Sequence, residues 1–512
     1  MENMRQKVAK GAVWAMLEKF GLQAVHFVVT LVLARLLTPT DYGTVALLSI
    51  FLGIAGSLAD CGFGRALVQK KNATDADFNS VFYISMVLSS AMYVILFCCA
   101  PAIARMYKTP ELCAILRMLG AMLLLHCINS VQNAELNRKL LFKLSFKISL
   151  IQAVVSASVG ISLAYLKYGP WALVWSQVGG GVAGTISRWF IIAWRPKFMF
   201  DWSALKSLFS FGWKMSLSGL IDSAYSNLSG ALIGKFYSKA DLAFVDKGKA
   251  LPAVGMGMIT GPLMRVSFPA MAQLQDDYSK ARDAMRRMIQ CSTFVVFPAM
   301  VGCAVCTPTL IPLMFGDQWI PSIPYMQITC FSMAFYPFHV INLQTIAALG
   351  RSDLFLKLEI IKKIYGLILL ALSLPHGVFC FAAVGVFVSC PLSLIVNSWP
   401  NRKLLKYTIA QQIMDVLPTA AISFAMGGVV WLSSWVLAVS GIEASHGTVM
   451  WYMIAKVFGQ FCVGVGAYLC LAIVFKLKPL NEFLSLIDEP LKAHAPNFRK
   501  HLCKILGGKD KG

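Results

Sequence analysis

Long apolar runs follow one another along this chain from its start to position 475, and each is long enough to cross a bilayer. A helix needs about 20 mostly apolar residues to span the hydrocarbon core of a membrane. Inside lipid, only helices and closed barrels satisfy their own backbone hydrogen bonds. The sequence therefore predicts an all-α, polytopic membrane protein of about 14 transmembrane helices. The expected runs are 11–36, 43–63, 80–104, 112–134, 146–166, 170–194, 208–234, 250–272, 290–315, 321–349, 353–374, 377–399, 411–440 and 449–475.

The composition excludes several classes of protein. Hydrophobic residues make up 57% of the 512 residues and charged residues only 14%, whereas soluble domains carry about 25% charge. Fourteen spans use up the length, so a cytosolic enzyme, a DNA-binding protein and a secreted module are excluded. Cys303 and Cys306 form a CxxC inside an apolar run without a partner pair, so we expect no metal site. We find no nucleotide-binding fingerprint in a supporting context, and we expect no cofactor and no enzymatic activity.

The basic residues indicate how the chain is oriented. The net charge is +22, and no basic run has the context of a nucleic-acid reader, so we expect no nucleic-acid partner. With an even number of helices both termini lie on one side. Segments on that side hold 32 Lys and Arg, and segments on the other side hold seven. The positive-inside rule then places both termini in the cytoplasm of a bacterial cell, with the protein in its inner membrane.

Two pairs of segments resemble each other at similar spacing. Residues 128–144 and 341–357 match at an offset of 213, and residues 33–45 and 233–245 match at an offset of 200. Asp41 and Asp241 correspond in the second pair. Repeated units with an even helix count share one orientation, as in transporters whose lobes rock about a central cavity. Chance alignment of apolar sequence is the alternative.

The repeat predicts a division of the chain into lobes. We expect two six-helix lobes in a parallel pseudo-repeat, followed by two extra helices and a basic tail. The expected bounds are 1–200 for the N-terminal lobe, 201–407 for the C-terminal lobe, 408–475 for the extra helices and 476–512 for the cytoplasmic tail.

Polar side chains form a stripe on the first run and another on the seventh. Residues three or four apart share a helix face, and polar groups inside a membrane tend to face a cavity. Because the two runs correspond in the repeat, we expect the stripes to line one cavity. The stripes are Lys19, Gln23, His26 and Thr30 in the first run, and Lys214, Ser218, Asp222, Tyr225 and Ser229 in the seventh.

The cations of these stripes suggest an anionic substrate. Lys19, Lys214 and Arg265 would bind a diphosphate through charge-assisted hydrogen bonds, and these three are the predicted substrate-binding residues. The alternative is snorkelling, because Lys19 and Lys214 lie about two turns from a helix end. Glu18, Asp222 and Asp246 are candidates for ion coupling, or else structural partners of cations.

Asp75-Ala76-Asp77 forms a DxD, the pattern that holds a metal-bound nucleotide sugar in many glycosyltransferases. It lies in a short loop without a surrounding α/β domain. The preceding Thr74 makes a helix start the better interpretation. The segments on the non-cytoplasmic side are too short to build the site of a polymerase or ligase.

Six segments in order resemble polysaccharide exporters of the multidrug/oligosaccharidyl-lipid/polysaccharide superfamily. The similarity covers nearly the whole chain. It is greatest to the branch with the colanic acid exporter and the related lipopolysaccharide or teichuronic acid exporters. The segments are LARLLTPTDYG (33–43), CGFGRALVQKK (61–71), ELNRKLLFKLSF (135–146), GPWALVWSQ (169–177), RVSFP (265–269) and FGDQWIPSIPYMQI (315–328).

The chain departs from this family at one place. Its members often carry an acidic residue before the LIGK stretch of the seventh helix, where this chain reads SGALIGK over 229–235. Carboxylate-based coupling at that point is therefore in doubt.

The resemblance implies a flippase for undecaprenyl-diphosphate-linked oligosaccharide repeat units, working by alternating access. Its substrate would be this lipid-linked oligosaccharide. It would be surrounded by membrane lipid, and a polysaccharide polymerase would be a partner. Two other functions stay open: a cation-coupled drug antiporter of the same fold, in which acidic cavity residues would dominate, and a membrane glycosyltransferase or polymerase. A scaffold without transport is disfavoured by the two polar stripes.

Overall fold

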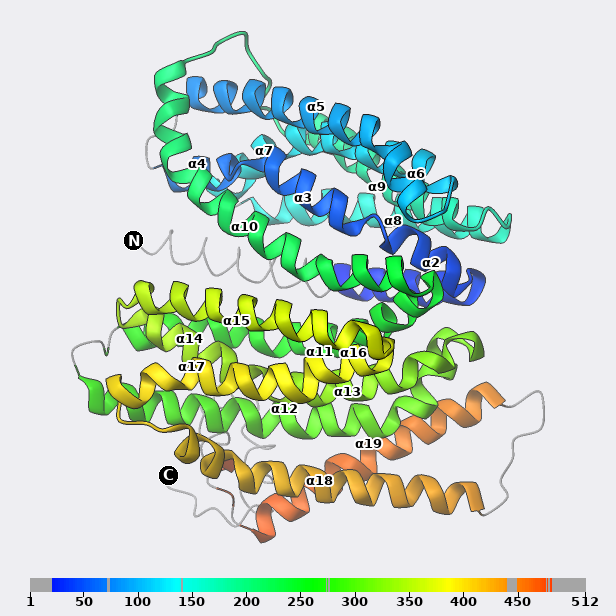
Figure 1. Ribbon diagram of the computed structural model, residues 1–512, viewed down its shortest axis with the longest axis vertical. Helices are drawn as coiled ribbons and strands as arrows, with labels where there is room; N and C mark the ends of the chain where they lie inside the picture. The colour runs from blue at the N-terminus through cyan, green and yellow to red at the C-terminus, as the bar shows by residue number, and fades with distance from the viewer. Residues whose placement is uncertain are drawn as a thin grey trace. The chain divides into compact units, whose positions relative to one another are not determined.

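The computed structural model describes residues 21–70, 74–139, 141–272, 274, 277–439, 449–475, 477 and 479–480. This part of the chain is helical almost throughout and has no strand, which confirms the all-α prediction (Figure 1). Backbone contacts divide the chain into two compact units, one up to Ala243 and one from Phe244. The six-helix lobes that the repeat predicts are not tested by this division and stay a prediction.

The first unit contains the helix Gly21–Leu36 and nine further helices that lead up to α11. In it α10 packs against α3, and α8 packs along α9. The nine are α2 (Pro39–Ala46), α3 (Ser49–Asp60), α4 (Phe63–Gln69), α5 (Asp75–Met106), α6 (Glu111–Gly120), α7 (Met122–Arg138), α8 (Phe142–Tyr165), α9 (Pro170–Ile191) and α10 (Trp202–Phe236).

The second unit begins within α11 (Lys239–Ala272). In it α12 packs against α13, α18 and α19. Its other elements are α12 (Tyr278–Phe315), η1 (Asp317–Ser322), α13 (Ile323–Ala334), α14 (Tyr336–Ala348), α15 (Ser352–Ser373), η2 (Leu374–His376), α16 (Val378–Val384), η3 (Gly385–Ser389), α17 (Cys390–Leu404), α18 (Ile409–Val439) and α19 (Val449–Val474).

In its described residues, each expected apolar run falls on one to three of these helical elements. In the described part of the chain, eight spans are long and apolar enough to cross a membrane, and this makes the protein a multi-pass membrane protein. The helix α15 is not among them, and it carries several charges: Asp353, Lys357, Glu359, Lys362 and Lys363. The total of 14 transmembrane helices stays a prediction.

The matched segments 33–45 and 233–245 fold into the same local structure. Thr38 caps α2: the backbone N–H of Thr38 donates to the Asp41 carboxylate at 2.9 Å, and Asp41 donates back to the Thr38 hydroxyl. At the start of α11, Ser238 and Asp241 make the same reciprocal pair of bonds, at 3.2 and 3.0 Å. Each capping box satisfies backbone donors that a helix start leaves free. The corresponding aspartates therefore have one role in both segments.

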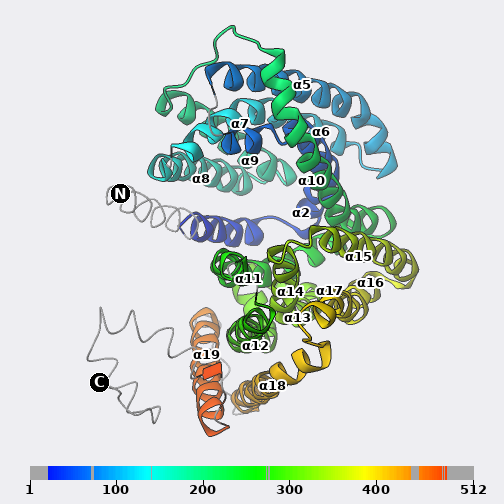
Figure 2. The same ribbon diagram turned by 90° about the vertical axis from the view of Figure 1, so that its left-hand side faces the viewer.

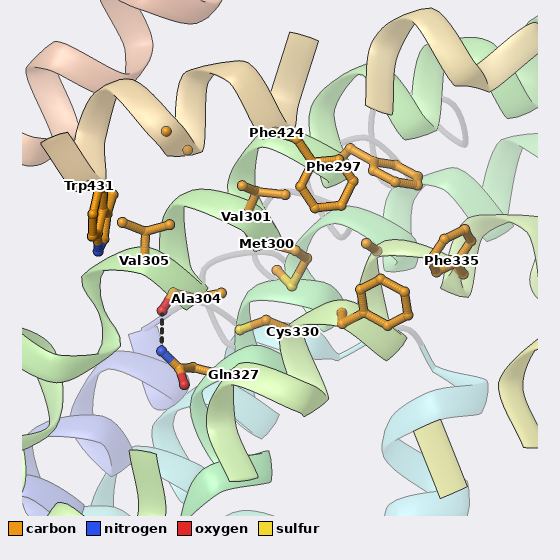
Figure 3. Close-up of a pocket in the computed structure, with 14 residues that line it drawn as sticks. Phe297, Met300, Val301, Ala304, Val305, Gln327, Cys330, Phe335, Phe424 and Trp431 are labelled. Carbon is orange, nitrogen blue, oxygen red and sulfur yellow. Dashed lines mark hydrogen bonds between the residues drawn. The ribbon is translucent and has the colours of Figure 1, made fainter. Parts of the chain in front are cut away.

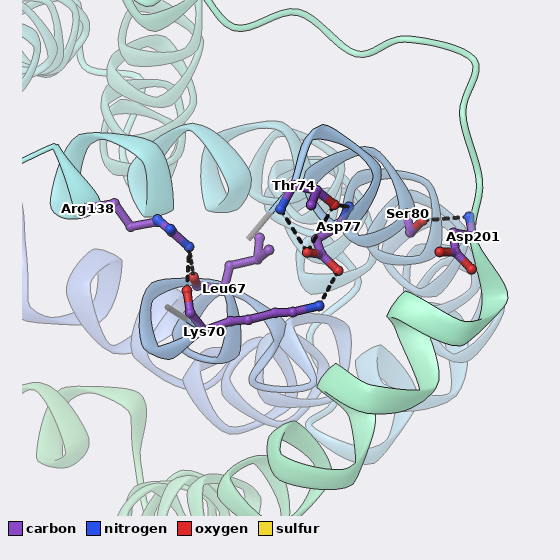
Figure 4. Close-up of polar contacts among 7 residues, drawn as sticks. All are labelled: Leu67, Lys70, Thr74, Asp77, Ser80, Arg138 and Asp201. Carbon is purple, nitrogen blue, oxygen red and sulfur yellow. Dashed lines mark hydrogen bonds and ion pairs between the residues drawn. The ribbon is translucent and has the colours of Figure 1, made fainter. Parts of the chain in front are cut away.

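A polar cluster joins α4, α5 and α7 (Figure 4). Arg138 donates from one nitrogen to the carbonyl oxygens of Leu67 and Lys70, both at 2.8 Å, and so satisfies the end of α4. Lys70 binds Asp77 at 2.7 Å, and the buried Asp77 carboxylate also accepts from the backbone N–H of Thr74. The DxD motif is thus a helix start, with Thr74 as the N-cap of α5. Asp77 has a structural role in this capping box.

Buried amide side chains connect α18 to α14 and α17 within the second unit. Asn342 on α14 donates to Gln412 on α18 at 2.9 Å, and Asn401 on α17 donates to Asn342 at 2.7 Å. All three side chains are fully buried. Arg286 and Tyr407 both bind Asp415 near the start of α18. Helices α18 and α19, the expected extra pair, lie side by side (Figure 2).

Candidate functional site

The first unit contains a polar hollow of about 670 Å³ inside a membrane protein. It is formed by α3, the start of α4 and α7. Small residues on α3 leave the space, and polar side chains on both helices surround it. The lining residues are Leu52, Gly53, Gly56, Ser57, Asp60, Gly64, His126, Ser130, Asn133, Ala134 and Asn137.

The polar groups of this hollow can both donate and accept hydrogen bonds. Ser130 approaches the Asp60 carboxylate, with its hydroxyl oxygen 3.5 Å from Oδ1. Asn133 and Asn137 add amides, each with two N–H donors and one carbonyl acceptor. The side chains of Asp60, Ser130 and Asn133 are half-buried, so a polar ligand that fills the hollow would replace the water around them. The hollow therefore suits a ligand rich in hydroxyl groups.

A cation lies beside the hollow. Arg188 on α9 donates through Nε to Oδ1 of Asn133 at 3.2 Å. Next to it, Asn129 on α7 donates to the Thr185 hydroxyl at 2.9 Å, so that α7 and α9 are joined at two points. A charged side chain on a membrane helix is costly unless it faces a polar region or a partner. Arg188 thus brings positive charge to the wall of the hollow and orients Asn133.

The residues of this hollow were missed at the level of sequence, although a signal for them exists. His126, Ser130, Asn133 and Asn137 are spaced 4, 3 and 4, the same spacing as the stripe on the first run. Residues at this spacing lie on one face of a helix, as the four residues do on α7. Asp60 is harder to find, because it is a single carboxylate at the end of α3 and only the fold brings it to α7.

Two polar residues of α10 outside the predicted stripe, Ser223 and Asn227, lie beside α3. Ser223 Oγ and Asn227 Nδ2 lie 2.7 and 3.3 Å from the place that a Cβ would take on Gly53, which lines the hollow. Of the predicted residues, Asp222 is exposed, and Tyr225 and Ser229 are half-buried. The side chains of Lys214 and Ser218 lie outside the described part. Among the described side chains of α10, Ser223 and Asn227 therefore lie at the hollow's edge, beside Gly53.

The other predicted site residues are placed only in part. On the helix Gly21–Leu36, Gln23 and Thr30 are half-buried and His26 is exposed. Lys19, Glu18 and the side chain of Arg265 lie outside the described residues. Their assignment to the cavity stays a prediction.

The predicted coupling residue Asp246 lies on α11, where its side chain is exposed. Lys247 and Lys249 follow it on the same helix. Lys247 itself is buried, with its ammonium 5.3 Å from the ring centres of Phe315 and Trp319. Asp246 therefore has basic neighbours on its own helix, and a role in ion coupling stays a prediction.

A second pocket, in the second unit, has the opposite character (Figure 3). Its volume is about 380 Å³, and aromatic and aliphatic side chains of α12, α13 and α18 line it. Gln327 is its one amide among the lining residues, and it donates to the Ala304 carbonyl oxygen at 3.3 Å. This pocket offers a sugar or a phosphate almost no hydrogen-bond partner. The polar hollow of the first unit is therefore the better candidate for a polar ligand.

Curated relatives cover most of the chain. It is 24% identical to the teichuronic acid biosynthesis protein TuaB of Bacillus subtilis, over 83% of this chain and 89% of that protein. It is 21% identical to the lipopolysaccharide biosynthesis protein WzxC of Escherichia coli, over 83% of this chain and 88% of that protein. These similarities span both units.

Solved structures share the fold. The lipid II flippase MurJ in an inward closed conformation matches with a TM-score of 0.70 and 13% identity, over 90% of this chain and 98% of that chain. An inward-facing multidrug resistance transporter of the MATE family matches with a TM-score of 0.59 and 14% identity, over 75% of this chain and 94% of that chain. At these identities the match shows the fold alone.

A family model described as polysaccharide biosynthesis protein matches residues 32–324, more than half of the chain. The chain therefore belongs to the polysaccharide biosynthesis protein family.

Proposed function

We propose that this protein is a flippase that moves undecaprenyl-diphosphate-linked oligosaccharide repeat units across the bacterial inner membrane for surface polysaccharide assembly. The polar hollow of the first unit carries this proposal, since it offers amides, a hydroxyl and a carboxylate inside a membrane protein. Membership of the polysaccharide biosynthesis family supports it, as do relatives named for teichuronic acid and lipopolysaccharide biosynthesis.

The energetics explain why such a hollow is needed. A hydroxyl group moved from water into hydrocarbon without a hydrogen-bond partner costs about 4–8 kcal/mol. An oligosaccharide carries many hydroxyl groups, so it does not cross a bilayer unaided. Asn133, Asn137, Ser130 and Asp60 would replace water around the sugars. The lipid tail would stay in the bilayer.

The diphosphate would be held by cations. Lys19, Lys214 and Arg265 remain our candidates, because Lys and Arg bind phosphate oxygens through charge-assisted hydrogen bonds. Arg188, beside the hollow, is a fourth candidate. The two predicted lobes, 1–200 and 201–407, would open the site to each side of the membrane in turn. No cofactor enters this mechanism.

The orientation follows from the charge count. The 32 basic residues counted on one side support a position of both termini in the cytoplasm. The substrate would be taken from the cytoplasmic leaflet and released to the periplasmic leaflet, where a polysaccharide polymerase would use it.

A deletion strain tests the proposal. Cells without the gene should accumulate lipid-linked repeat units in the cytoplasmic leaflet and lose the surface polymer, because the units are made but do not cross. The measurement is mass spectrometry of extracted lipid-linked oligosaccharides, with and without prior treatment of intact spheroplasts by an impermeant glycosidase. A plasmid copy of the gene should restore the polymer.

Two other outcomes would contradict the proposal. Unchanged surface polymer with a gain in sensitivity to cationic drugs would indicate an antiporter of the same fold. Absence of the repeat units themselves would indicate a glycosyltransferase.

A further inference from the structure

The connection between α9 and α10 exposes an unusual run of large apolar side chains. Residues 192–201 are not helical. Phe198 is fully exposed, and Phe200 and Trp202 are 53% and 67% exposed. Met199 between them is 47% exposed. Apolar side chains at this density outside the helices of a membrane protein need an apolar environment.

The backbone of this connection is held in place by α5. The backbone N–H of Lys197 donates to Asn79 Oδ1 at 2.6 Å, and that of Asp201 donates to Ser80 Oγ at 2.8 Å (Figure 4 shows the second bond). Both acceptor side chains are fully buried. The segment 194–202 is therefore an ordered strap along α5, in which the backbone N–H groups of Lys197 and Asp201 have partners that lipid would not supply.

Contacts with α5 place the strap at the edge of the hydrocarbon core. Phe198 stacks on Tyr83, with ring centres 6.2 Å apart, and Lys197 binds Asp75 at 3.0 Å. The 32 residues of α5 extend about 48 Å at 1.5 Å per residue, against a hydrocarbon core of about 30 Å. When the length of α5 beyond the hydrocarbon core is divided equally between the two ends of the helix, it is about 9 Å per end. Tyr83 lies about 12 Å from Asp75 along the helix, so Phe198 falls at the boundary and Lys197 in the headgroup region.

Charged side chains lie on the strap and at the start of α10. Lys197 on the strap, which is paired with Asp75, and Lys206 on α10 are exposed, as is Asp201. The Arg195 guanidinium is turned inward to the carbonyl oxygens of Ile192 and Trp189. Exposed aromatic rings flanked by lysine are the composition that anchors proteins at a membrane interface. A lysine near an anionic bilayer surface is attracted to it.

We propose that the strap 194–202 is a membrane-interface anchor: Phe198, Met199, Phe200 and Trp202 insert at the boundary of the acyl chains, and Lys197 and Lys206 bind anionic lipid headgroups. The strap leads directly into α10, whose residues Ser223 and Asn227 reach the edge of the polar hollow. The lipid surface thereby fixes the beginning of that helix. This inference does not depend on the transported substrate.

A fluorescent amino acid in the strap tests the anchor. The environment-sensitive residue Anap, introduced by an amber codon in place of Phe198, is measured in the full-length protein in phosphatidylglycerol and phosphatidylethanolamine vesicles. We expect blue-shifted emission and strong quenching by lipids brominated high on the acyl chain. The matched control is Anap in place of Lys280, whose side chain is 74% exposed at the start of α12. It should emit at longer wavelength and be quenched weakly.

The charge component is tested in the same system. Lys197→Gln together with Lys206→Gln should reduce the difference in quenching between vesicles with and without phosphatidylglycerol. Anap in place of Phe200 provides a second probe site with the same expected result. Equal emission and equal weak quenching at positions 198, 200 and 280 would overturn the proposal, and would indicate that the strap faces water or another protein.

Discussion

A Gly43→Ala variant is expected to be less stable than the native protein and to support less export. Gly43 lies in α2, and a Cβ added there would stand 1.9 Å from the carbonyl oxygen of Lys239 and 2.5 Å from its carbonyl carbon. These are backbone atoms at the start of α11, so no rotamer change relieves the clash. Overpacking of this kind costs about 1–3 kcal/mol or more, against a helix-propensity gain of about 1 kcal/mol for alanine.

The measurement for Gly43→Ala is the apparent Tm of the purified protein in detergent, with surface polymer in the complemented strain. The Tm should fall by several degrees, and the amount of folded protein should fall with it. The control is Gly466→Ala on α19, where an added Cβ meets nothing within 4 Å. That variant should be as stable as the native protein or more so. A native Tm for Gly43→Ala would show that α2 and α11 do not meet as described.

The second large effect is expected at Asn133. An Asn133→Leu variant removes the acceptor of Arg188 Nε and places an apolar group in the hollow. A hydrogen bond between the Asn133 amide and a substrate hydroxyl would contribute about 0.5–1.5 kcal/mol, and each 1.4 kcal/mol corresponds to about tenfold in a binding constant. Export, normalised to the amount of protein in the membrane, should therefore fall several-fold, up to about tenfold.

The control for Asn133→Leu is Asn133→Asp, which keeps an oxygen acceptor for Arg188 and should retain much of the export. Export is measured as surface polymer per cell, normalised to the amount of protein in the membrane. Native export by the leucine variant at an equal protein level would mean that the substrate does not use the hollow.

Much of the fold can be predicted from the sequence, because lipid restricts which secondary structures can cross the membrane. Apolar runs of about 20 residues can only be helices there, and local signals mark their ends. Thr74 and Asp77 predict the start of α5 through a capping box, and the structure confirms it. The similarity of 33–45 and 233–245 predicts a common local structure, and Asp41 and Asp241 do cap their helices in the same way.

The site was harder to predict because it depends on which helix faces are brought together. The stripe on the seventh run was identified from spacing alone, and its place in a cavity stays a prediction. The positions of Ser223 and Asn227 beside α3 are known only from the fold. Asp60 reaches α7 only through the turn at Cys61 and Gly62, where both residues have positive φ. The pairing of Arg188 with Asn133 joins residues 55 positions apart. Spacing within one helix carries no information on such contacts.

The most direct test of the proposed flippase activity uses the purified protein alone. The protein is reconstituted into vesicles that contain a lipid-linked oligosaccharide with a diphosphate, and an impermeant glycosidase is added outside. We predict that substrate of the inner leaflet becomes accessible and is cleaved to completion in vesicles with the native protein, and slowly with Asn133→Leu. Cleavage that stops at the outer half, as in vesicles without protein, would contradict the account.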